Sequence, residues 1–211
     1  MATRKLVVFD LDGTLNQTHL FSVPAHLQAL QEFGIEGISE ETIISGYGAR
    51  IDDFIRQNFP HLDAATIQAY IHRASELEKD FIRERGKPYD GVPFMLQQLR
   101  EGGCVTAVCS NASERYIRLV LDSLLLSPLI DEVQPLLPDM TKVETLRILL
   151  DRVAPSSAAM VGDRFFDKEA AEGNHIPFIG CLYGYAPQEV SDGDAAVHSA
   201  SEIFAAAMQL L

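Results

Sequence analysis

Short hydrophobic runs, separated by stretches with more regularly spaced polar residues, organise most of the chain. Four of these runs do not alternate with polar residues, which is typical of strands covered on both faces of a parallel sheet. They lie at residues 6–9, 105–109, 158–161 and 178–182, and weaker candidates lie at 131–134 and 195–198. We expect each of these runs to form a strand.

The segments between the runs carry apolar residues at helical spacing. Helices are predicted at 92–100, at 113–126 with Tyr116 on the apolar stripe, and at 141–150, and a last helix begins with a capping-box pattern from Ser199 to Glu202. Strands that alternate with helices in this way are typical of a doubly wound α/β fold with a mostly parallel, Rossmann-like sheet.

One region interrupts this alternation and carries no convincing strand. From residue 18 to residue 85 the pattern is helical, with Ser22 predicted to cap a helix that ends at Gly34 and Asp63 predicted to begin a longer one. We therefore predict two domains. Residues 1–17 and 86–211 form an α/β core, and residues 18–85 form an all-helical insertion.

Composition narrows the classes of function. The 211 residues include 17 Lys and Arg against 30 Asp and Glu, a formal net charge of −13, which disfavours binding to nucleic-acid polymers or anionic membranes. The three cysteines have neither disulfide nor zinc spacing, and the apolar run before Asp10 is too short for a signal peptide or a membrane span. We expect a cytoplasmic protein that is a monomer or a weak homodimer.

Polar side chains directly follow three of the predicted strands. Asp10 and Asp12 follow the first and point to the same side of an extended segment, Ser110 and Asn111 follow the second, and Asp163 follows the third. The carboxyl ends of parallel strands form the ligand crevice of an open α/β sheet, so these groups are expected to converge. Hydroxyl and N–H groups there can hold a phosphate oxygen. Taken singly, each signal also fits a turn or a helix cap.

Two further residues extend this predicted site. Asp167 lies four residues after Asp163 and either reaches the same place or caps the following helix. Lys142 stands at the head of a predicted helix, where a cation opposes the helix dipole, and a solvated surface lysine is the alternative. Carboxylate oxygens with no nearby His or Cys are ligands that suit Mg²⁺.

The order of these motifs resembles the haloacid dehalogenase superfamily of aspartate-dependent phosphotransferases. Asp10-Leu11-Asp12-Gly13-Thr14 matches its first motif, Ser110 its second, Lys142 its third, and Gly162-Asp163 with Asp167 its fourth. The helical insertion looks like the C1 cap of that family. Residues 178–185 are similar to a segment of its phosphoglycolate phosphatase-like branch.

This resemblance implies a magnesium-dependent phosphatase acting on a small phosphorylated metabolite. Asp10 would attack phosphorus and form an aspartyl-phosphate, Asp12 would serve as general acid and base, and Ser110 and Lys142 would stabilise the nucleophile and the transferring oxygens. Substrate binding is expected from Ser110, Asn111 and Lys142. The expected magnesium ligands are Asp10, Asp12 through its backbone carbonyl, Asp163, and Asp167 either directly or through water.

Some assignments stay open. Arg50, in the glycine-flanked loop 46–50, is a candidate for a second anionic group of the substrate or a plain surface arginine, and His19 is a candidate to reach the site. A β-phosphoglucomutase-like transferase is the alternative enzyme. A catalytically silent protein that binds a phosphorylated ligand is the alternative from another class.

Overall fold

The computed structural model describes residues 4–211, apart from the side chain of Asp52; residues 1–3, predicted to belong to the core, lie outside it. A six-stranded sheet has the order β3-β2-β1-β4-β5-β6, and all of its neighbouring pairs are parallel. The predicted α/β class with a parallel sheet is thus confirmed. The strands are β1 (Lys5–Phe9), β2 (Cys104–Ser110), β3 (Glu132–Pro135), β4 (Ser157–Gly162), β5 (Phe178–Cys181) and β6 (Ala195–Val197).

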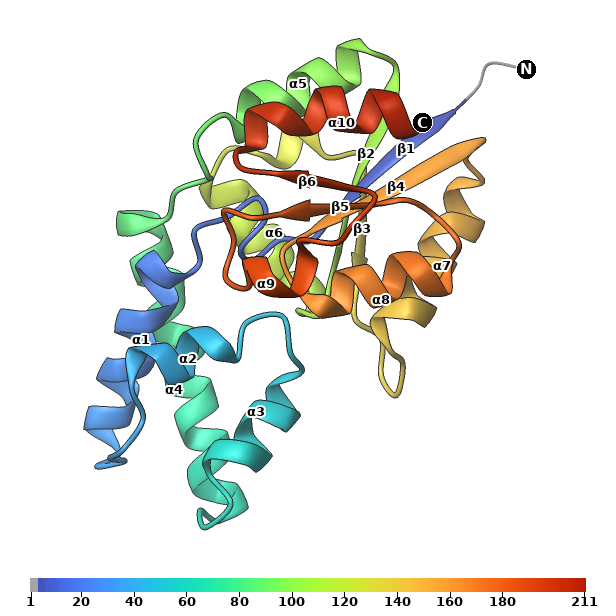
Figure 1. Ribbon diagram of the computed structural model, residues 1–211. Coiled ribbons are helices and arrows are strands. Elements are labelled where there is room, and N and C mark those ends of the chain that lie inside the picture. Colours follow the sequence, from blue (N-terminus) through green and yellow to red (C-terminus); the bar gives the residue numbers. More distant parts are fainter. Residues whose placement is uncertain (1–3) are drawn as a thin grey trace.

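Helices cover both faces of the sheet (Figure 1). Val7 and Phe9 of β1 pack with the helices α5 (Val92–Glu101), α6 (Glu114–Ser123) and α10 (Ile203–Leu210). Leu6 and Val8 pack on the opposite side with α7 (Lys142–Val153), α8 (Phe165–Gly173) and α9 (Pro187–Val190). Side chains that alternate between two apolar layers explain why the strand sequences lack polar alternation.

The region between β1 and α5 is helical, as predicted. It contains α1 (His19–Glu32), α2 (Glu40–Ser45), α3 (Ile51–Asn58) and α4 (Ala64–Arg85), and α1 packs against α4. These helices lie together beyond one end of the sheet (Figure 1) and share an apolar cluster of their own that includes Ala29, Tyr70 and Leu77. Asp63 begins α4 as expected, since its side chain accepts a hydrogen bond from the amide of Thr66.

Two predicted helix starts are wrong. Ser22 does not cap a helix, because the amides of Phe21 and Ser22 donate to the carbonyl of Thr18 and α1 already begins at His19. Proline is favoured in the first turn of a helix, so Pro24 is consistent with a helix that begins after Ser22. In the structure Pro24 instead lies inside α1.

The capping box predicted at Ser199 is also absent. The side chain of Ser199 caps no amide, and a short 3₁₀ turn, η2 (Ala200–Glu202), moves the start of α10 to Ile203. A second 3₁₀ turn, η1 (Ser127–Leu129), precedes β3.

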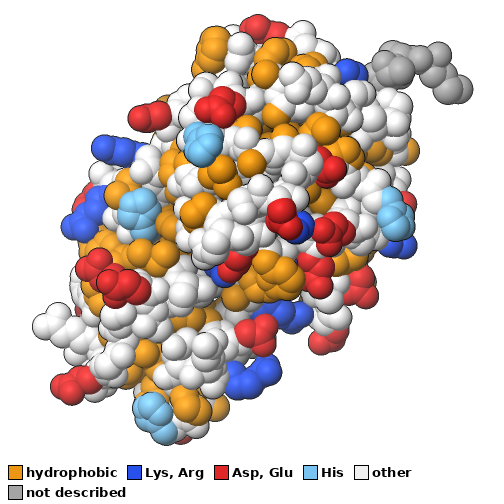
Figure 2. Space-filling view, in the orientation of Figure 1, with side chains coloured by type: hydrophobic (Ala, Val, Ile, Leu, Met, Phe, Trp, Pro, Cys, Tyr) orange, Lys and Arg blue, Asp and Glu red, His pale blue; other side chains and the backbone are white. Residues whose placement is uncertain are grey.

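The surface agrees with the acidic composition. On the face shown in Figure 2, Asp and Glu side chains are spread widely and no broad basic area is present. Within residues 4–211, no helix is both long enough and apolar enough to cross a membrane.

Candidate active site

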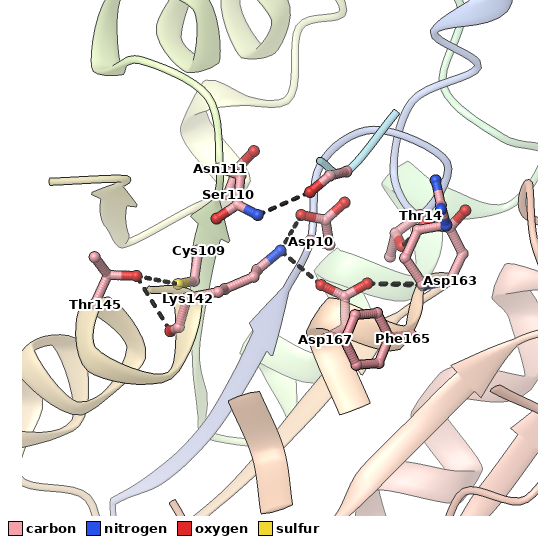
Figure 3. A network of polar contacts seen from close by, with 12 residues as sticks. Asp10, Thr14, Cys109, Ser110, Asn111, Lys142, Thr145, Asp163, Phe165 and Asp167 are labelled. Carbon is pink, nitrogen blue, oxygen red and sulfur yellow. Dashed lines mark hydrogen bonds and ion pairs between the residues drawn. The ribbon is translucent and has the colours of Figure 1, made fainter. Parts of the chain in front are cut away.

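The carboxyl ends of the central strands place the predicted polar residues together. Phe9, the last residue of β1, pairs with Val108 of β2 and Val161 of β4, so the residues just after these positions lie at one edge of the sheet. Asp10 and Asp163 are buried there, and Figure 3 shows them with Ser110 around one site.

Lys142 lies at the centre of this site. Thr141 and Glu144 form a capping box that begins α7. Lys142 is therefore the first residue of this helix and points toward the end of β1. Its ammonium group bonds the carboxylate of Asp10 and lies 2.6 Å from Oδ1 of Asp167 (Figure 3). Lys142 is only 5% exposed, so it is not a solvated surface lysine.

Three carboxylates surround this lysine. Oxygens of Asp10, Asp163 and Asp167 lie within 4.8 Å of one another, and all three residues are buried. Asp167 accepts hydrogen bonds through Oδ2 from the amides of Asp163 (3.1 Å) and Arg164 (3.0 Å), which leaves Oδ1 facing Lys142. Buried charges need compensation, and one lysine cannot balance three carboxylates. The site therefore suits a divalent cation with a preference for oxygen ligands, such as Mg²⁺.

The pKa values of the carboxyl groups point the same way. Burial is the main cause that raises the pKa of Asp10 from 3.8 to about 7, although Lys142 opposes the shift. Burial also raises the pKa of Asp163 well above its usual range, and the charge of Asp167 adds to this. A bound cation favours the ionised form of such groups. Full ionisation of this site at neutral pH thus calls for further positive charge.

The carboxylate of Asp12 lies outside this group of three and is held separately. Its Oδ1 accepts three hydrogen bonds, from the hydroxyls of Thr18 (2.6 Å) and Tyr116 (3.0 Å) and from the side-chain amide of Asn16 (3.3 Å). Burial raises the pKa of Asp12, while these three donors lower it. A carboxyl with one oxygen fixed and a raised pKa is suited to exchange a proton through the other oxygen.

A cavity of about 340 Å³ extends from Asp10 and Asp12 into the helical region. The loop 46–50 closes over it, and hydrogen bonds tie the loop to the core. Asn111 donates to the carbonyl of Gly48 at 2.8 Å, and Arg164 donates to the carbonyl of Tyr47. The carboxylates of Asp10 and Asp12 therefore lie at the floor of a partly open cavity beneath the helical region.

Comparison with known proteins decides the family. The haloacid dehalogenase-like hydrolase family matches residues 7–181. The chain belongs to this family. It is 31% identical over 198 residues to a phosphoglycolate phosphatase of Xylella fastidiosa, a match that covers 88% of this chain and 83% of that protein. The prediction of a phosphatase of the haloacid dehalogenase-like family is confirmed at this level.

Solved structures share the same fold. A predicted phosphatase from Clostridium acetobutylicum superposes with a TM-score of 0.84 at 22% identity, covering 100% of both chains. A predicted phosphoglycolate phosphatase from Haemophilus somnus superposes with a TM-score of 0.86 at 20% identity, covering 98% of this chain and 99% of that one. The haloacid dehalogenase-like fold therefore spans both the sheet and the helical insertion.

In this haloacid dehalogenase-like hydrolase, most of the predicted site residues come together. Besides the residues already described, Ser110 and Asn111 line the cavity, and the hydroxyl of Ser110 accepts a hydrogen bond from the amide of Ala112 at 3.2 Å. Arg50 instead donates to the carbonyl of Met140 at 3.1 Å and is not among the residues that line the cavity. The ring of His19 pairs with the hydroxyl of Tyr185 at 3.1 Å.

The structure also brings residues to the site that the sequence reasoning missed. Thr18 and Tyr116 reach Asp12, and His26 and Glu78 line the cavity from α1 and α4. Tyr116 fits the apolar stripe of its helix, so the sequence pattern gives no sign that its hydroxyl has a polar partner. Only the position of Glu78 next to the apolar face of a long amphipathic helix offered a signal.

Proposed function

We propose that this chain is a Mg²⁺-dependent phosphatase that hydrolyses a small phosphate monoester through an aspartyl-phosphate on Asp10. One observation carries the proposal: Asp10 is bonded to Lys142 and grouped with two further buried carboxylates, with Asp12 held separately at the same cavity floor. The family membership shown above supports the same chemistry.

The first step uses Asp10 as nucleophile. Its carboxylate oxygen forms a bond to phosphorus as the ester bond to the leaving oxygen breaks, and protonated Asp12 gives its proton to that oxygen. Lys142 orients Asp10, and its charge, with the hydroxyl of Ser110, stabilises the transferring oxygens. Mg²⁺, held by Asp10, Asp163 and Asp167 with the Asp12 carbonyl, would offset the negative charge of the phosphate and the carboxylates.

The second step releases phosphate. Asp12, now ionised, accepts a proton from water as the water oxygen attacks phosphorus, and the bond between phosphorus and the Asp10 oxygen breaks. The products are inorganic phosphate and the original carboxylate of Asp10. One residue thus acts as acid and then as base.

The helices of residues 18–85 serve as a cap domain in this proposal. They form the roof of the cavity, and exclusion of bulk water strengthens the electrostatic interactions within it. The cavity volume of about 340 Å³ suits a small ester and not a polymer. The relative from Xylella fastidiosa is named for phosphoglycolate, which makes this ester one substrate to test, beside nucleoside monophosphates and sugar phosphates.

Removal of Mg²⁺ tests the proposal. We expect the purified protein to release phosphate from p-nitrophenyl phosphate in Mg²⁺, to lose this activity in a chelator, and to regain it when Mg²⁺ is restored. Full activity in the chelator would contradict the proposal. Conversion of glucose 1-phosphate without phosphate release would favour the mutase, and binding of esters without turnover would favour the silent binding protein.

Tyr116→Phe tests the role given to Asp12. The tyrosine hydroxyl lowers the pKa of Asp12, so its loss should raise that pKa further. Ionised Asp12 then forms only at higher pH, so the rising limb of the plot of kcat against pH should shift to higher pH. We expect kcat itself to be lower by about tenfold. The measurement is the pH profile for p-nitrophenyl phosphate. An unchanged limb would show that the hydrogen bond does not act on the proton-transferring group.

A further inference from the structure

The cavity beyond the reacting carboxylates has an unusual charge pattern for a site that takes a phosphate ester. Its roof is largely apolar, and the polar side chains within it are Ser22 and His26 from α1, Tyr47 from the loop after α2, and Ser75 and Glu78 from α4. Among the described residues that line the cavity, none is Lys or Arg. The part of the cavity that receives the leaving group therefore offers no fixed positive charge.

Glu78 is the charged group of this roof. Its side chain is only 14% exposed, and among the described residues its only basic partner within 4.0 Å is His26, whose Nε2 lies 3.7 Å from Oε1 of Glu78. The other ring nitrogen of His26 lies 2.6 Å from the hydroxyl of Tyr70, and burial lowers the pKa of His26 to about 4, so the ring is neutral at pH 7. Glu78 thus lacks a full counter-charge.

Two polar atoms of residues that line the cavity lack hydrogen-bond partners. The hydroxyl oxygen of Tyr47 and Oδ1 of Asn111 are buried and make no hydrogen bond with the described residues. Burial raises the pKa of Glu78 to about 7, although the hydroxyl of Ser22 opposes the shift. Buried polar atoms are normally paired, so Oδ1 of Asn111 is available to a ligand that donates a hydrogen bond, and the hydroxyl of Tyr47 to one that donates or accepts.

We infer that the substrate has a leaving group that donates hydrogen bonds and carries no negative charge, and that Glu78 selects it. The inference rests on the proposed function, because it places the phosphate at Asp10. Hydroxyl groups of a polyol or sugar and an ammonium group share the required chemistry.

A carboxylate-bearing ester such as phosphoglycolate does not fit this roof. Its second anion would be desolvated beside Glu78 and would find no cation among the lining residues, which is the costly arrangement for a buried charge. Arg50 is the candidate that the sequence offers for such a group, with a plain surface arginine as the alternative, and in the structure it donates to the carbonyl of Met140 on the core. The structure therefore favours a neutral or cationic leaving group over an acidic one.

The test compares four esters on the full chain with Mg²⁺: p-nitrophenyl phosphate, glycerol 3-phosphate, phosphoethanolamine and 2-phosphoglycolate. We expect kcat/KM for glycerol 3-phosphate or phosphoethanolamine to exceed that for phosphoglycolate by about tenfold or more. The better of the two preferred esters tells whether hydroxyl or ammonium groups are recognised, and either result supports the inference.

Glu78→Gln keeps the shape of the side chain and removes its charge. It should reduce the preference for the non-acidic ester over phosphoglycolate by about tenfold, because the charged acceptor is lost. Glu84→Gln, an exposed change on the same helix, should leave this ratio unchanged. A purely structural role for Glu78, as the partner of His26, would lower thermal stability and leave the ratio as it is.

The outcomes separate this inference from the proposed function. Hydrolysis of p-nitrophenyl phosphate together with a preference for phosphoglycolate would overturn the inference and leave the phosphatase proposal intact. No hydrolysis of any of the four esters would overturn both. An unchanged ratio in folded Glu78→Gln would overturn the role of Glu78, and the wild-type comparison alone decides the substrate class if that variant does not fold.

Discussion

Asp10→Asn is expected to lower kcat for p-nitrophenyl phosphate by about 10³-fold or more. The amide keeps the size of the side chain but is a poor nucleophile, so the bond to phosphorus cannot form at a useful rate. The loss should appear in kcat for every ester, because the same oxygen attacks phosphorus whatever the leaving group. Steady-state phosphate release in saturating Mg²⁺ measures it.

The Asp10→Asn protein should remain folded. Asp10 lies beside Asp163 and Asp167, so removal of its charge relieves repulsion among buried carboxylates, and Lys142 keeps Asp167 as a partner. Thermal unfolding without Mg²⁺ should therefore show no loss of stability. Asp90→Asn, an exposed change outside the cavity, is the matched control and should keep full activity. Substantial turnover by a folded Asp10→Asn protein would contradict the assignment of the nucleophile.

Lys142→Met is expected to destabilise the Mg²⁺-free protein by about 3–5 kcal/mol, the usual cost of removing one partner from a buried ion pair. The variant leaves Asp10 and Asp167 without the ammonium group that bonds both. Turnover should fall sharply as well, since the nucleophile loses the group that orients it. Urea unfolding measures the first effect, and phosphate release measures the second.

The stability loss in Lys142→Met should depend on pH in a definite direction. The pKa of Asp10 is raised to about 7 with Lys142 present, and loss of the lysine raises it further. A carboxyl with a raised folded-state pKa costs stability as pH rises above its unfolded value, so the deficit should be largest at pH 8 and smaller at pH 5.

A matched lysine on the surface provides the control for this variant. Lys168 pairs with Asp192 on the surface and does not reach the site, so Lys168→Met should change stability little at either pH. Mg²⁺ should restore part of the stability of Lys142→Met. Equal effects of the two lysine variants would contradict the buried ion-pair account.

Much of the site follows from the sequence because parallel strands impose it. A strand covered on both faces needs a continuous apolar run, and the end of each run then marks the ligand edge of the sheet. Asp10, Ser110 and Asp163 could therefore be placed together although they are far apart in the chain. Even the two weak runs proved to be strands, β3 and β6, which form the two edges of the sheet.

The remaining features depend on packing that no local pattern encodes. Tyr116 reaches Asp12 across 104 residues of sequence, and its ring looks like one more apolar residue on the buried face of α6. Glu78 lines the cavity only because α4 packs over the core, and Ser22 is buried rather than capping because tertiary contacts extend α1 by one turn. Tertiary contacts of this kind override the local helix propensity.

The phosphorylated form of Asp10 is the central claim, and an acid-quenched mass measurement tests it most directly. In Asp12→Asn, p-nitrophenyl phosphate can still phosphorylate Asp10, because its leaving group needs little help from a proton donor, while hydrolysis is slowed by loss of the base. We expect one added phosphoryl group, located on the peptide that contains Asp10 and absent when Asp10→Asn is also present. A phosphoryl group on another residue, or rapid phosphate release with none on the protein, would contradict the account.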